Sequence, residues 1–345
     1  MNPTIPKTML AVAVSQYETQ LERIDAPVPT PKQDEVLIQV HASGLCSTDI
    51  HLLNGRQSLG NLPRILGHET AGEIVSLGDN VTNWQIGDRV VVAIDVVCGN
   101  CEHCHSGNTQ RCQHKTRIGF ERDGGHAEYV TVPAKNLVLL PTNISYKEAS
   151  ILPDAVACMY HCLVTQGQLR VNQKIVILGI GGLGIHGIQI ARLAGAEVVA
   201  TSRRDHRLLA AKEFGAIPVN TLKEDLTAVV NDFTDGVGAD IVADCIGTTA
   251  SIKEGLSLLR PGGKLLVIAY IDEMFQVPSI PLFSLEKEII GCRGSTKQEL
   301  MDVVKLVSTG KLQTVIGAEF PLSQIHQAVD LLEAGDMLGR IVLTR

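Results

Sequence analysis

The chain has 345 residues, of which 45% are hydrophobic and 19% are charged, so it is long enough for two domains and has the composition of an ordinary globular protein. The formal net charge is −7 and there is no block of lysines or arginines, which argues against nucleic-acid or membrane-surface binding. The N-terminus lacks a basic-then-apolar signal pattern, and the longest apolar run, residues 175–185, is too short to span a bilayer. We therefore expect a cytoplasmic protein with neither a membrane nor a nucleic acid as its partner.

Residues 1 to about 150 show short strand-like runs rather than strands that alternate with long helices. The runs at 35–41, 72–78 and 89–94 are rich in Val, Ile and Leu, and Gly, Asp and Asn separate them. This pattern predicts a compact, partly barrel-like β domain.

Two polar clusters interrupt this domain. The first combines the stretch from Gly44 to His51, which contains Cys46, with the later sequence Gly67-His68-Glu69. Cysteine and histidine suit Zn²⁺, so Cys46 and His68 are candidate metal ligands. On the residues alone a buried structural pair explains them equally well, because two ligands from separate loops do not close a site.

The second cluster consists of Cys98, Cys101, Cys104 and Cys112. Four thiolates at this spacing predict a closed structural zinc site without an open coordination position, and therefore without chemistry of its own. An iron–sulfur cluster can use a similar spacing, and disulfides are disfavoured in a cytosolic chain. We predict that the ion fixes a loop that has little apolar content.

Residues 174–178 form an apolar run of strand length, and a helical pattern covers residues 185–194. Between them lies a G-x-G-x-x-G turn made of Gly179, Gly181, Gly182, Leu183 and Gly184. A strand, this turn and a helix form the fingerprint of a dinucleotide site. Its first glycine permits the tight turn, the second lets the backbone approach a pyrophosphate, and the last lets the helix pack on the strand.

The apolar run at 197–201 predicts the second parallel strand, whose end reads Ser202-Arg203-Arg204-Asp205. An acidic residue at this end binds the ribose 2′-hydroxyl of NAD. Here Ser202 takes its place and two arginines follow, which suit a 2′-phosphate, so we predict NADP(H) in preference to NAD(H). The alternative is that the arginines open an exposed helix and Asp205 selects NAD, although Asp205 fits better as the first acid of that helix.

Later apolar runs at 240–246, 263–268 and 288–291 alternate with helical spans near 205–214 and 250–260. The sequence Pro261-Gly-Gly263 predicts a sharp turn before the second of these strands. The alternation predicts an α/β domain with a doubly wound parallel sheet, a Rossmann domain.

Taken in order, these motifs resemble those of zinc-dependent alcohol dehydrogenases of the medium-chain dehydrogenase/reductase superfamily, and the resemblance covers essentially the whole chain. It implies a GroES-like catalytic zinc domain over residues 1–151 and 297–345, a Rossmann domain over 152–296, and an active site in the cleft between them. A helix near 297–309 and a closing strand near 339–343 would complete the first domain.

The implied activity interconverts an alcohol and an aldehyde or ketone by hydride transfer, in a homo-oligomer that is a dimer or a tetramer. The nearest alternative is an NAD(H)-dependent polyol or secondary-alcohol dehydrogenase of the same superfamily. A nucleotide-binding protein without catalysis is a more distant one.

The resemblance also implies two zinc ions per subunit, one structural and one catalytic. The family usually takes its third catalytic ligand from a cysteine, but Asp154 occupies the aligned position here, with Cys158 as a lesser candidate. The implied ligands are therefore Cys46, His68 and Asp154. Because a carboxylate is a harder ligand than a thiolate, we predict a weaker hold on zinc.

Other roles are carried over by the same resemblance. Glu69 would lie beside the ion or ligate it transiently, and Asp49 would orient His68, a task compatible with capping a turn. Thr48 would hydrogen-bond the substrate oxygen, and His51 would pass a proton towards solvent, unless it is an ordinary surface histidine.

Three further residues are implied as cofactor contacts. Ile246 and Ile268 would lie at strand ends beside the nicotinamide, although a place in the core is the simpler interpretation of each. Arg340 would contact the cofactor phosphates, with an exposed terminal arginine as the alternative.

Overall fold

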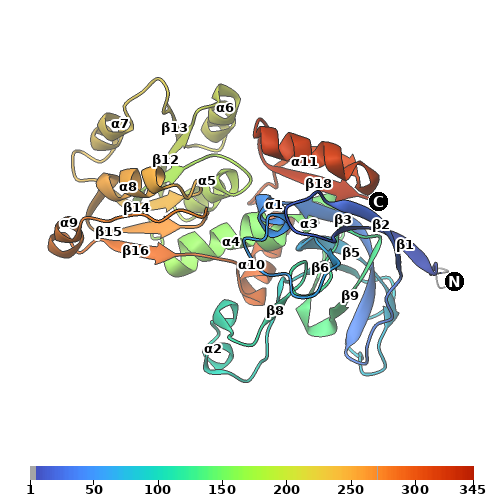
Figure 1. Cartoon of the computed structure of the whole chain (residues 1–345). Coiled ribbons are helices and arrows are strands. Elements are labelled where there is room, and N and C mark those ends of the chain that lie inside the picture. Colours follow the sequence, from blue (N-terminus) through green and yellow to red (C-terminus); the bar gives the residue numbers. More distant parts are fainter. Residues whose placement is uncertain (1–4, 270) are drawn as a thin grey trace. The chain divides into compact units, whose positions relative to one another are not determined.

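The computed structural model describes residues 5–269 and 271–345. They divide into two compact units, one made of the residues up to Ala157 with Gly294–Gly310 and Ile316–Arg345, the other of Cys158–Arg293 with Lys311–Val315. The first boundary thus lies six residues beyond the expected one, and Asp154 belongs to the first unit. Helical structure continues through this stretch almost without interruption, which leaves the sequence no signal at the boundary (Figure 1).

The first unit is built from antiparallel strands, as the short apolar runs predict. Its largest sheet has the order β10-β6-β5-β3-β18-β17, with β9 also paired to β3; the strands are β3 (Glu35–Leu45), β5 (Glu69–Leu77), β6 (Arg89–Val92), β9 (Tyr129–Pro133), β10 (Leu137–Leu139), β17 (Ile316–Pro321) and β18 (Arg340–Thr344). Only β17 and β18 pair in parallel. The β-rich domain that the sequence predicts for this part of the chain is therefore present.

Two smaller sheets and several short helices complete this unit. One sheet is formed by β1 (Thr8–Val14), β2 (Glu22–Pro27) and β4 (Arg64–Ile65), and the other by β7 (Asp95–Val96) and β8 (Thr116–Arg117). The helices are α1 (Ser47–Leu53), α2 (Glu102–His105), α3 (Tyr146–Ser150), the π-helix η3 (Leu152–Val156), α10 (Lys297–Ser308) and α11 (Ile325–Ala334), with 3₁₀ turns η1 (Thr109–Arg111), η2 (Ala134–Asn136) and η5 (Leu322–Gln324).

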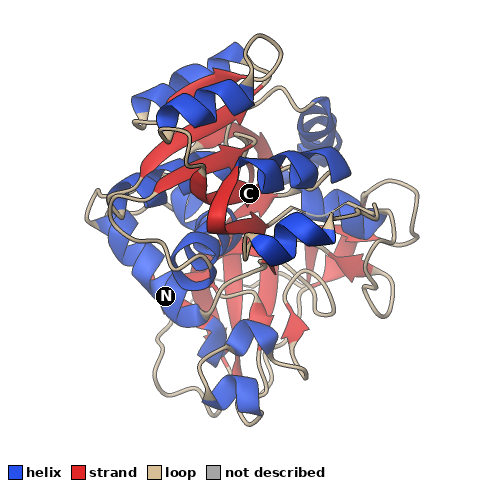
Figure 2. Cartoon of the chain, turned by 90° about the vertical axis from the view of Figure 1, so that its left-hand side faces the viewer, coloured by secondary structure: helices blue, strands red, loops and turns tan. Residues whose placement is uncertain are grey.

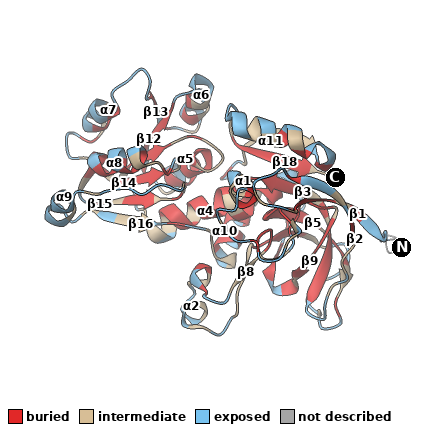
Figure 3. Ribbon diagram, viewed as in Figure 1, coloured by how far each residue is buried: buried red, intermediate tan, exposed pale blue. Residues whose placement is uncertain are grey.

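The long strand β3 holds this unit together because it pairs with β5, β9 and β18 at once. Its residues are almost all buried, and the unit's apolar side chains form cores on both sides of it (Figure 3). The C-terminal end of β3, the start of β5 and the start of β18 meet through the register pairs Gly44–Glu69 and Leu45–Ile341. Polar residues from these three ends are thereby brought together.

The second unit is a six-stranded parallel sheet with helices in the connections (Figure 2), as the alternating pattern predicts. The order is β13 (Ile217–Asn220), β12 (Glu197–Ser202), β11 (Lys174–Leu178), β14 (Ala239–Asp244), β15 (Leu259–Val267) and β16 (Glu288–Gly291). The helices are α4 (Ala157–Tyr160), the π-helix η4 (His161–Gln166), α5 (Gly184–Leu193), α6 (Asp205–Glu213), α7 (Leu226–Phe233), α8 (Thr249–Leu258) and α9 (Ser279–Ser284).

The chain order reverses between β11 and β14, so the doubly wound sheet has its switch point there. One local prediction is wrong: Pro261-Gly262-Gly263 lies inside β15 rather than in a turn before it. The pairing of β14 with β15 shifts register at this place, so the unpaired residues form an irregularity within the strand rather than a turn before it. Across the described residues no helix has both the length and the apolar character that crossing a membrane requires.

Candidate active site and metal centres

The first functional segment is the turn from β3 into α1. Cys46 is the residue that caps α1, and the Asp49 carboxylate accepts its backbone N–H at 2.8 Å. A short acceptor in the first turn stabilises the helix start, so this carboxylate has a capping role. Its other oxygen lies 3.5 Å from Nδ1 of His68, and both residues are buried. Asp49 therefore both caps the helix and faces the histidine.

His68 and Glu69 lie where the chain enters β5. Gly67 precedes them with φ +98°, a conformation that favours glycine. A Cβ at Gly67 would also lie 2.4 Å from the backbone nitrogen of His126, so this position has no room for a side chain.

Asp154 comes from the π-helix η3, an irregular helix of a kind that is frequent at functional sites. Its Oδ2 lies 3.6 Å from Sγ of Cys46 and 3.8 Å from Nε2 of His68. One ligand atom from each of these three residues lies within 4.8 Å of the others. The structure thus brings together the three residues that the sequence implies as ligands, and the cluster contains Asp154 rather than Cys158.

Charges around this cluster are unbalanced. Burial disfavours the charged form of His68, but Asp49 first, and then Asp154 and Cys46, outweigh this and raise the pKa of His68 well above its usual range. Burial would raise the pKa of Asp154, yet His68 and Arg340 hold it below its usual range. Burial raises the pKa of Glu69 to about 7, against the pull of Arg340.

Arg340 provides the guanidinium in this cluster. It is 6% exposed, its Nη2 lies 2.7 Å from Glu69 Oε1 and 2.5 Å from Asp154 Oδ2, and its Nε donates to Glu69 at 2.9 Å. Arg340 is therefore not an exposed terminal arginine, and its guanidinium is paired with Glu69 and Asp154. It neutralises one of the three neighbouring carboxylates, those of Asp49, Glu69 and Asp154.

The residues fit a zinc ion. Tetrahedral zinc bonds of about 2.0–2.3 Å place ligand atoms roughly 3.3–3.8 Å apart. The distances from Asp154 to Cys46 and to His68 have this spacing, and all three ligand atoms lie within 4.8 Å of one another. Nδ1 of His68 and Oδ1 of Asp49 have no other hydrogen-bond partner among the described residues, as expected of a ligand histidine and its orienting carboxylate. With His68 neutral, as a metal ligand must be, the three carboxylates outnumber the Arg340 guanidinium by two charges, which a divalent cation would balance.

The cysteine loop forms a second cluster. Sγ–Sγ distances are 3.5 Å for Cys98–Cys112, 3.6 Å for Cys101–Cys104 and 3.9 Å for Cys98–Cys104. Zn–S bonds of about 2.3 Å give this spacing around one tetrahedral ion, with no room for a cluster of several metal atoms. The backbone of Asn100 hydrogen-bonds the Cys98 thiol and lowers its pKa to about 6, which favours the thiolate that binds metal.

The glycine turn has the geometry that its fingerprint predicts. Gly179 has φ +90°, and a Cβ on Gly184 would lie 2.1 Å from the carbonyl oxygen of Gly179. A Cβ on Gly181 would meet nothing within 4 Å, so space for a ligand lies over it. This turn ends β11 at the switch point of the sheet, where ligands of open α/β sheets bind.

The end of β12 lies beside this turn, because the Gly179 N–H donates to Thr201 Oγ1 at 3.3 Å. Ser202 is buried and its Oγ accepts the Arg204 N–H at 3.1 Å, whereas Arg203 and Arg204 are exposed. The Asp205 carboxylate begins α6 and accepts from Asn220 at 2.7 Å and Lys223 at 2.8 Å.

The remaining expected residues lie as follows. Ile246 follows β14, is 42% exposed, and has its side chain next to Gly179, whereas Ile268 follows β15 and is buried. Thr48 and His51 lie on α1 and are half-buried. Burial, and then Arg56, lower the pKa of His51, which keeps it neutral at pH 7.

Sequence reasoning missed two residues of this site. His126 is fully buried with Nε2 at 3.6 Å from Asp49 Oδ2, and Ser43 Oγ lies 2.9 Å from its Nδ1. The signal was available as Gly124-Gly125-His126, a histidine after two glycines just before a strand.

The family models match two segments: the alcohol dehydrogenase GroES-like domain over residues 32–142, and the zinc-binding dehydrogenase domain over residues 182–309. The chain is 33% identical to the D-arabitol-phosphate dehydrogenase of Enterococcus avium over 324 residues, 92% of each chain. The crystal structure of an NAD-dependent alcohol dehydrogenase is 30% identical, with a TM-score of 0.92 and coverage of 98% of this chain and 100% of that one.

A zinc-binding dehydrogenase from Sinorhizobium meliloti, solved with NADP bound, is 27% identical with a TM-score of 0.88, covering 99% and 100% of the two chains. With the fold and the ligand cluster, these similarities define the class. The chain belongs to the zinc-dependent alcohol dehydrogenases of the medium-chain dehydrogenase/reductase superfamily and is an oxidoreductase.

Proposed function

We propose that the protein interconverts an alcohol and an aldehyde or ketone, with hydride exchanged with NADP(H), in a zinc-dependent reaction. The observation that carries this proposal is the cluster of Cys46, His68 and Asp154, which offers three ligand atoms at tetrahedral spacing. Three protein ligands leave a fourth position for a substrate oxygen, as catalytic zinc sites require.

Zinc held by these residues would polarise the oxygen of the alcohol or carbonyl and lower its pKa. The chain's own groups do the rest. Asp49 holds Nδ1 of His68 and so presents Nε2 to the ion. The Thr48 hydroxyl would accept the substrate proton, and neutral His51 would take it onward towards solvent. Glu69 would balance charge beside the ion, since its second oxygen has no hydrogen-bond partner among the described residues.

The preference for NADP(H) is supported by the end of β12. A 2′-phosphate carries roughly −1.5 to −2 charges, and Arg203 and Arg204 present the only two consecutive arginines in the sequence at this strand end. Asp205 is the residue that could select NAD instead, but its carboxylate accepts hydrogen bonds from Asn220 and Lys223. The solved relatives include one named for NAD and one with NADP bound, so the fold alone does not decide.

Three further parts of the proposal follow from the same class. The four-cysteine loop would hold a second, structural zinc ion. The protein would work in the cytoplasm as a homo-oligomer, a dimer or tetramer. The proposed domains are a catalytic zinc domain over residues 1–151 and 297–345 and a dinucleotide-binding domain over residues 152–296. The compact units differ from these bounds by a few residues, and they place the zinc ligands in the first unit and the glycine turn in the second.

An NAD(H)-dependent polyol dehydrogenase is the second candidate, favoured by the similarity to the D-arabitol-phosphate dehydrogenase. A nucleotide-binding protein without catalysis is disfavoured by the complete ligand cluster.

The test is a panel of primary and secondary alcohols, polyols, sugar-alcohol phosphates and their carbonyl products, assayed with NADPH and NADH side by side. We expect turnover that is faster with NADPH, and mild chelation should abolish it while the four-cysteine site keeps its zinc. Readdition of zinc should restore the rate. Full activity in zinc-free protein, or binding of cofactor without turnover of any substrate, would contradict the proposal.

A further inference from the structure

His126 is a buried histidine that the mechanism above does not use. It is fully buried, as is Asp49, and Ser43 is 1% exposed. Its backbone is fixed on both sides, because its N–H donates to Leu66 at 2.9 Å and its carbonyl accepts from Val12 at 2.7 Å. The ring therefore has a defined place.

The space for this ring is made by glycine. A Cβ on Gly67 would lie 2.6 Å from Nδ1 of His126, as well as clashing with its backbone. Gly67 is thus required both for the turn that presents His68 and for the room that His126 occupies. The two histidines are placed by one feature of the chain.

The protons on this ring follow from its neighbours. The Asp49 carboxylate is an acceptor only, and its Oδ2 lies 3.6 Å from Nε2 of His126. An Nε2 lone pair aimed at a carboxylate would be repelled, so Nε2 carries the hydrogen and Nδ1 accepts from the Ser43 hydroxyl at 2.9 Å. The polar chain runs from Ser43 through His126 to Asp49, and from Asp49 to His68.

We propose that His126 is a positioning residue for the catalytic metal: its Nε2–H faces Oδ2 of Asp49 at 3.6 Å and attracts the carboxylate electrostatically, while His68 faces Oδ1, and Ser43 fixes the tautomer that presents this N–H. This rests on the proposed zinc site. Asp49 is fully buried and its Oδ2 accepts from the backbone N–H of Cys46; the nearby Nε2–H of His126 adds an attraction at the same oxygen, which keeps Oδ1 towards His68. Groups that directly orient a ligand histidine, as Asp49 does here, typically change metal affinity about 10–100-fold when lost, so the loss of His126, which acts through Asp49, should have an effect near the lower end of this range.

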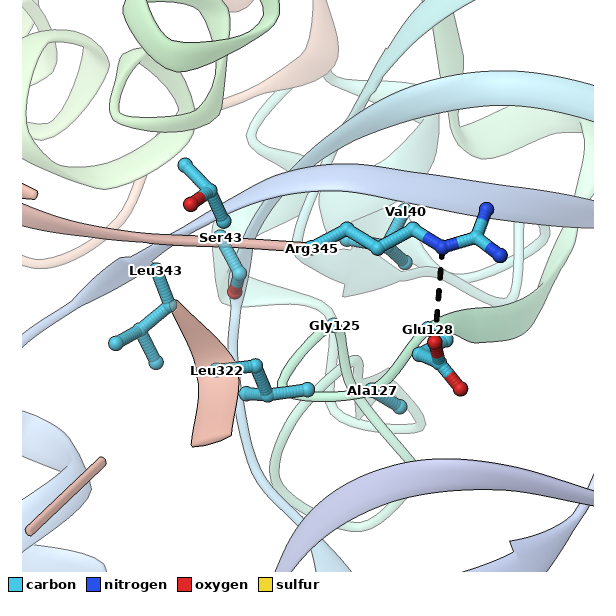
Figure 4. A pocket seen from close by; sticks show the side chains of 9 residues that line it. Val40, Ser43, Gly125, Ala127, Glu128, Leu322, Leu343 and Arg345 are labelled. Carbon is cyan, nitrogen blue, oxygen red and sulfur yellow. Dashed lines mark ion pairs between the residues drawn. The ribbon is translucent and has the colours of Figure 1, made fainter. Parts of the chain in front are cut away.

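Ser43 also lines a cavity of about 10 Å³, shown in Figure 4 with Glu128 and Arg345 at its edge. A space of roughly 10–15 Å³ is what one water molecule needs. Truncation of the Ser43 side chain removes the hydrogen bond to Nδ1 but leaves the imidazole and its Nε2 in place. Loss of the serine hydroxyl should therefore matter less than loss of the histidine.

The experiment compares zinc release from the wild type, His126→Gln, His126→Leu and Ser43→Ala. Glutamine places an N–H close to the position of Nε2, whereas leucine fills the space without a donor. Protein loaded with two zinc ions is mixed with a chelator, and the two release phases are followed with a colorimetric zinc indicator. The four-cysteine zinc is the internal reference for intact folding, together with circular dichroism.

We expect His126→Leu to release the catalytic zinc about tenfold faster with the four-cysteine phase unchanged, and His126→Gln and Ser43→Ala to stay within about threefold of wild type. Wild-type release from His126→Leu, or equal acceleration in the leucine and glutamine variants, would overturn the role of the N–H. A wild type that binds only one zinc ion would instead refute the proposed function, so the two failures are distinguishable.

Discussion

At the scale of single residues, the site depends on a buried carboxylate that has no room to move. Glu69 is fully buried, its Oε1 accepts from Arg340 and from the Ala155 N–H at 3.2 Å, and its Oε2 lies against Gly44. A Cβ on Gly44 would lie 1.8 Å from that oxygen. The glycine two residues before Cys46 is therefore explained by the acid that it faces.

The first prediction concerns Gly44→Ala. The φ of Gly44 is outside the left-handed region, so alanine fits the backbone, and the cost comes from the clash of its Cβ with the Glu69 side chain. We expect overpacking of about 1–3 kcal/mol, measured as a lower midpoint of chemical denaturation, and a fall in kcat from the displaced acid.

The matched variant is Gly44→Ala combined with Glu69→Asp, which shortens the acid by one methylene group. When Glu69 has been replaced by aspartate, the further change Gly44→Ala should lower the free energy of unfolding much less than it does in the wild type. If Gly44→Ala is as stable and as active as the wild type, the close approach of Glu69 to position 44 does not matter for stability or activity.

How much of the site the sequence could predict depends on how local each interaction is. Cys46, Thr48 and Asp49 lie within one helix turn, so a motif presents them together. Arg340 reaches Glu69 across 271 residues, and His126 reaches Ser43 across 83, and no local pattern encodes either contact. The resemblance supplied Asp154, whereas it did not imply the ion pairs of Arg340 with Glu69 and Asp154.

At the scale of elements, the strand ends decide the chemistry. The apolar run at 174–178 matches β11 residue for residue, because a parallel strand buried on both faces is a continuous apolar segment, and the run at 288–291 matches the partly exposed edge strand β16. The Pro-Gly-Gly sequence misled because a register shift kept it within β15. The π-helix that carries Asp154 has no sequence signature at all.

The second prediction tests the cofactor choice at the end of β12. Ser202→Asp restores an acid that can bind a ribose 2′-hydroxyl and that repels a 2′-phosphate. We expect the ratio of kcat/KM for NADPH to that for NADH to fall at least about tenfold, which corresponds to about 1.4 kcal/mol.

Asp205→Asn is the control, three residues further along. Because Asp205 is held by Asn220 and Lys223, this variant should leave the ratio within about twofold of wild type. If Asp205→Asn abolishes the use of NADH while Ser202→Asp changes nothing, Asp205 is the selector and the preference for NADP(H) is wrong.

At the scale of the whole molecule, the second unit presents an apolar edge. Met274 is 97% exposed, Ile280 76% and Phe283 87%, and the latter two lie on α9 just before β16 (Figure 3). Within the described part of the chain β16 pairs only with β15, so its other edge carries unpaired backbone groups. Large exposed side chains beside an open strand edge are typical of an interface, and a second copy could pair with this edge about a twofold axis.

The last prediction is that Phe283→Glu separates the oligomer. Burying a phenylalanine side chain contributes about 1.5–3 kcal/mol, and a twofold axis counts it twice, so a buried charge there should weaken association by several orders of magnitude. Light scattering after size exclusion should give at least 74 kDa for the wild type, twice the 37.1 kDa of one chain, and 37.1 kDa for the variant. Leu209→Glu on α6, 65% exposed and away from β16 in the sheet order, should keep the wild-type mass. A monomeric wild type would refute the oligomer itself. An unchanged mass for Phe283→Glu would place the interface elsewhere, because an edge that tolerates a carboxylate at its most exposed aromatic residue is not buried by a second copy.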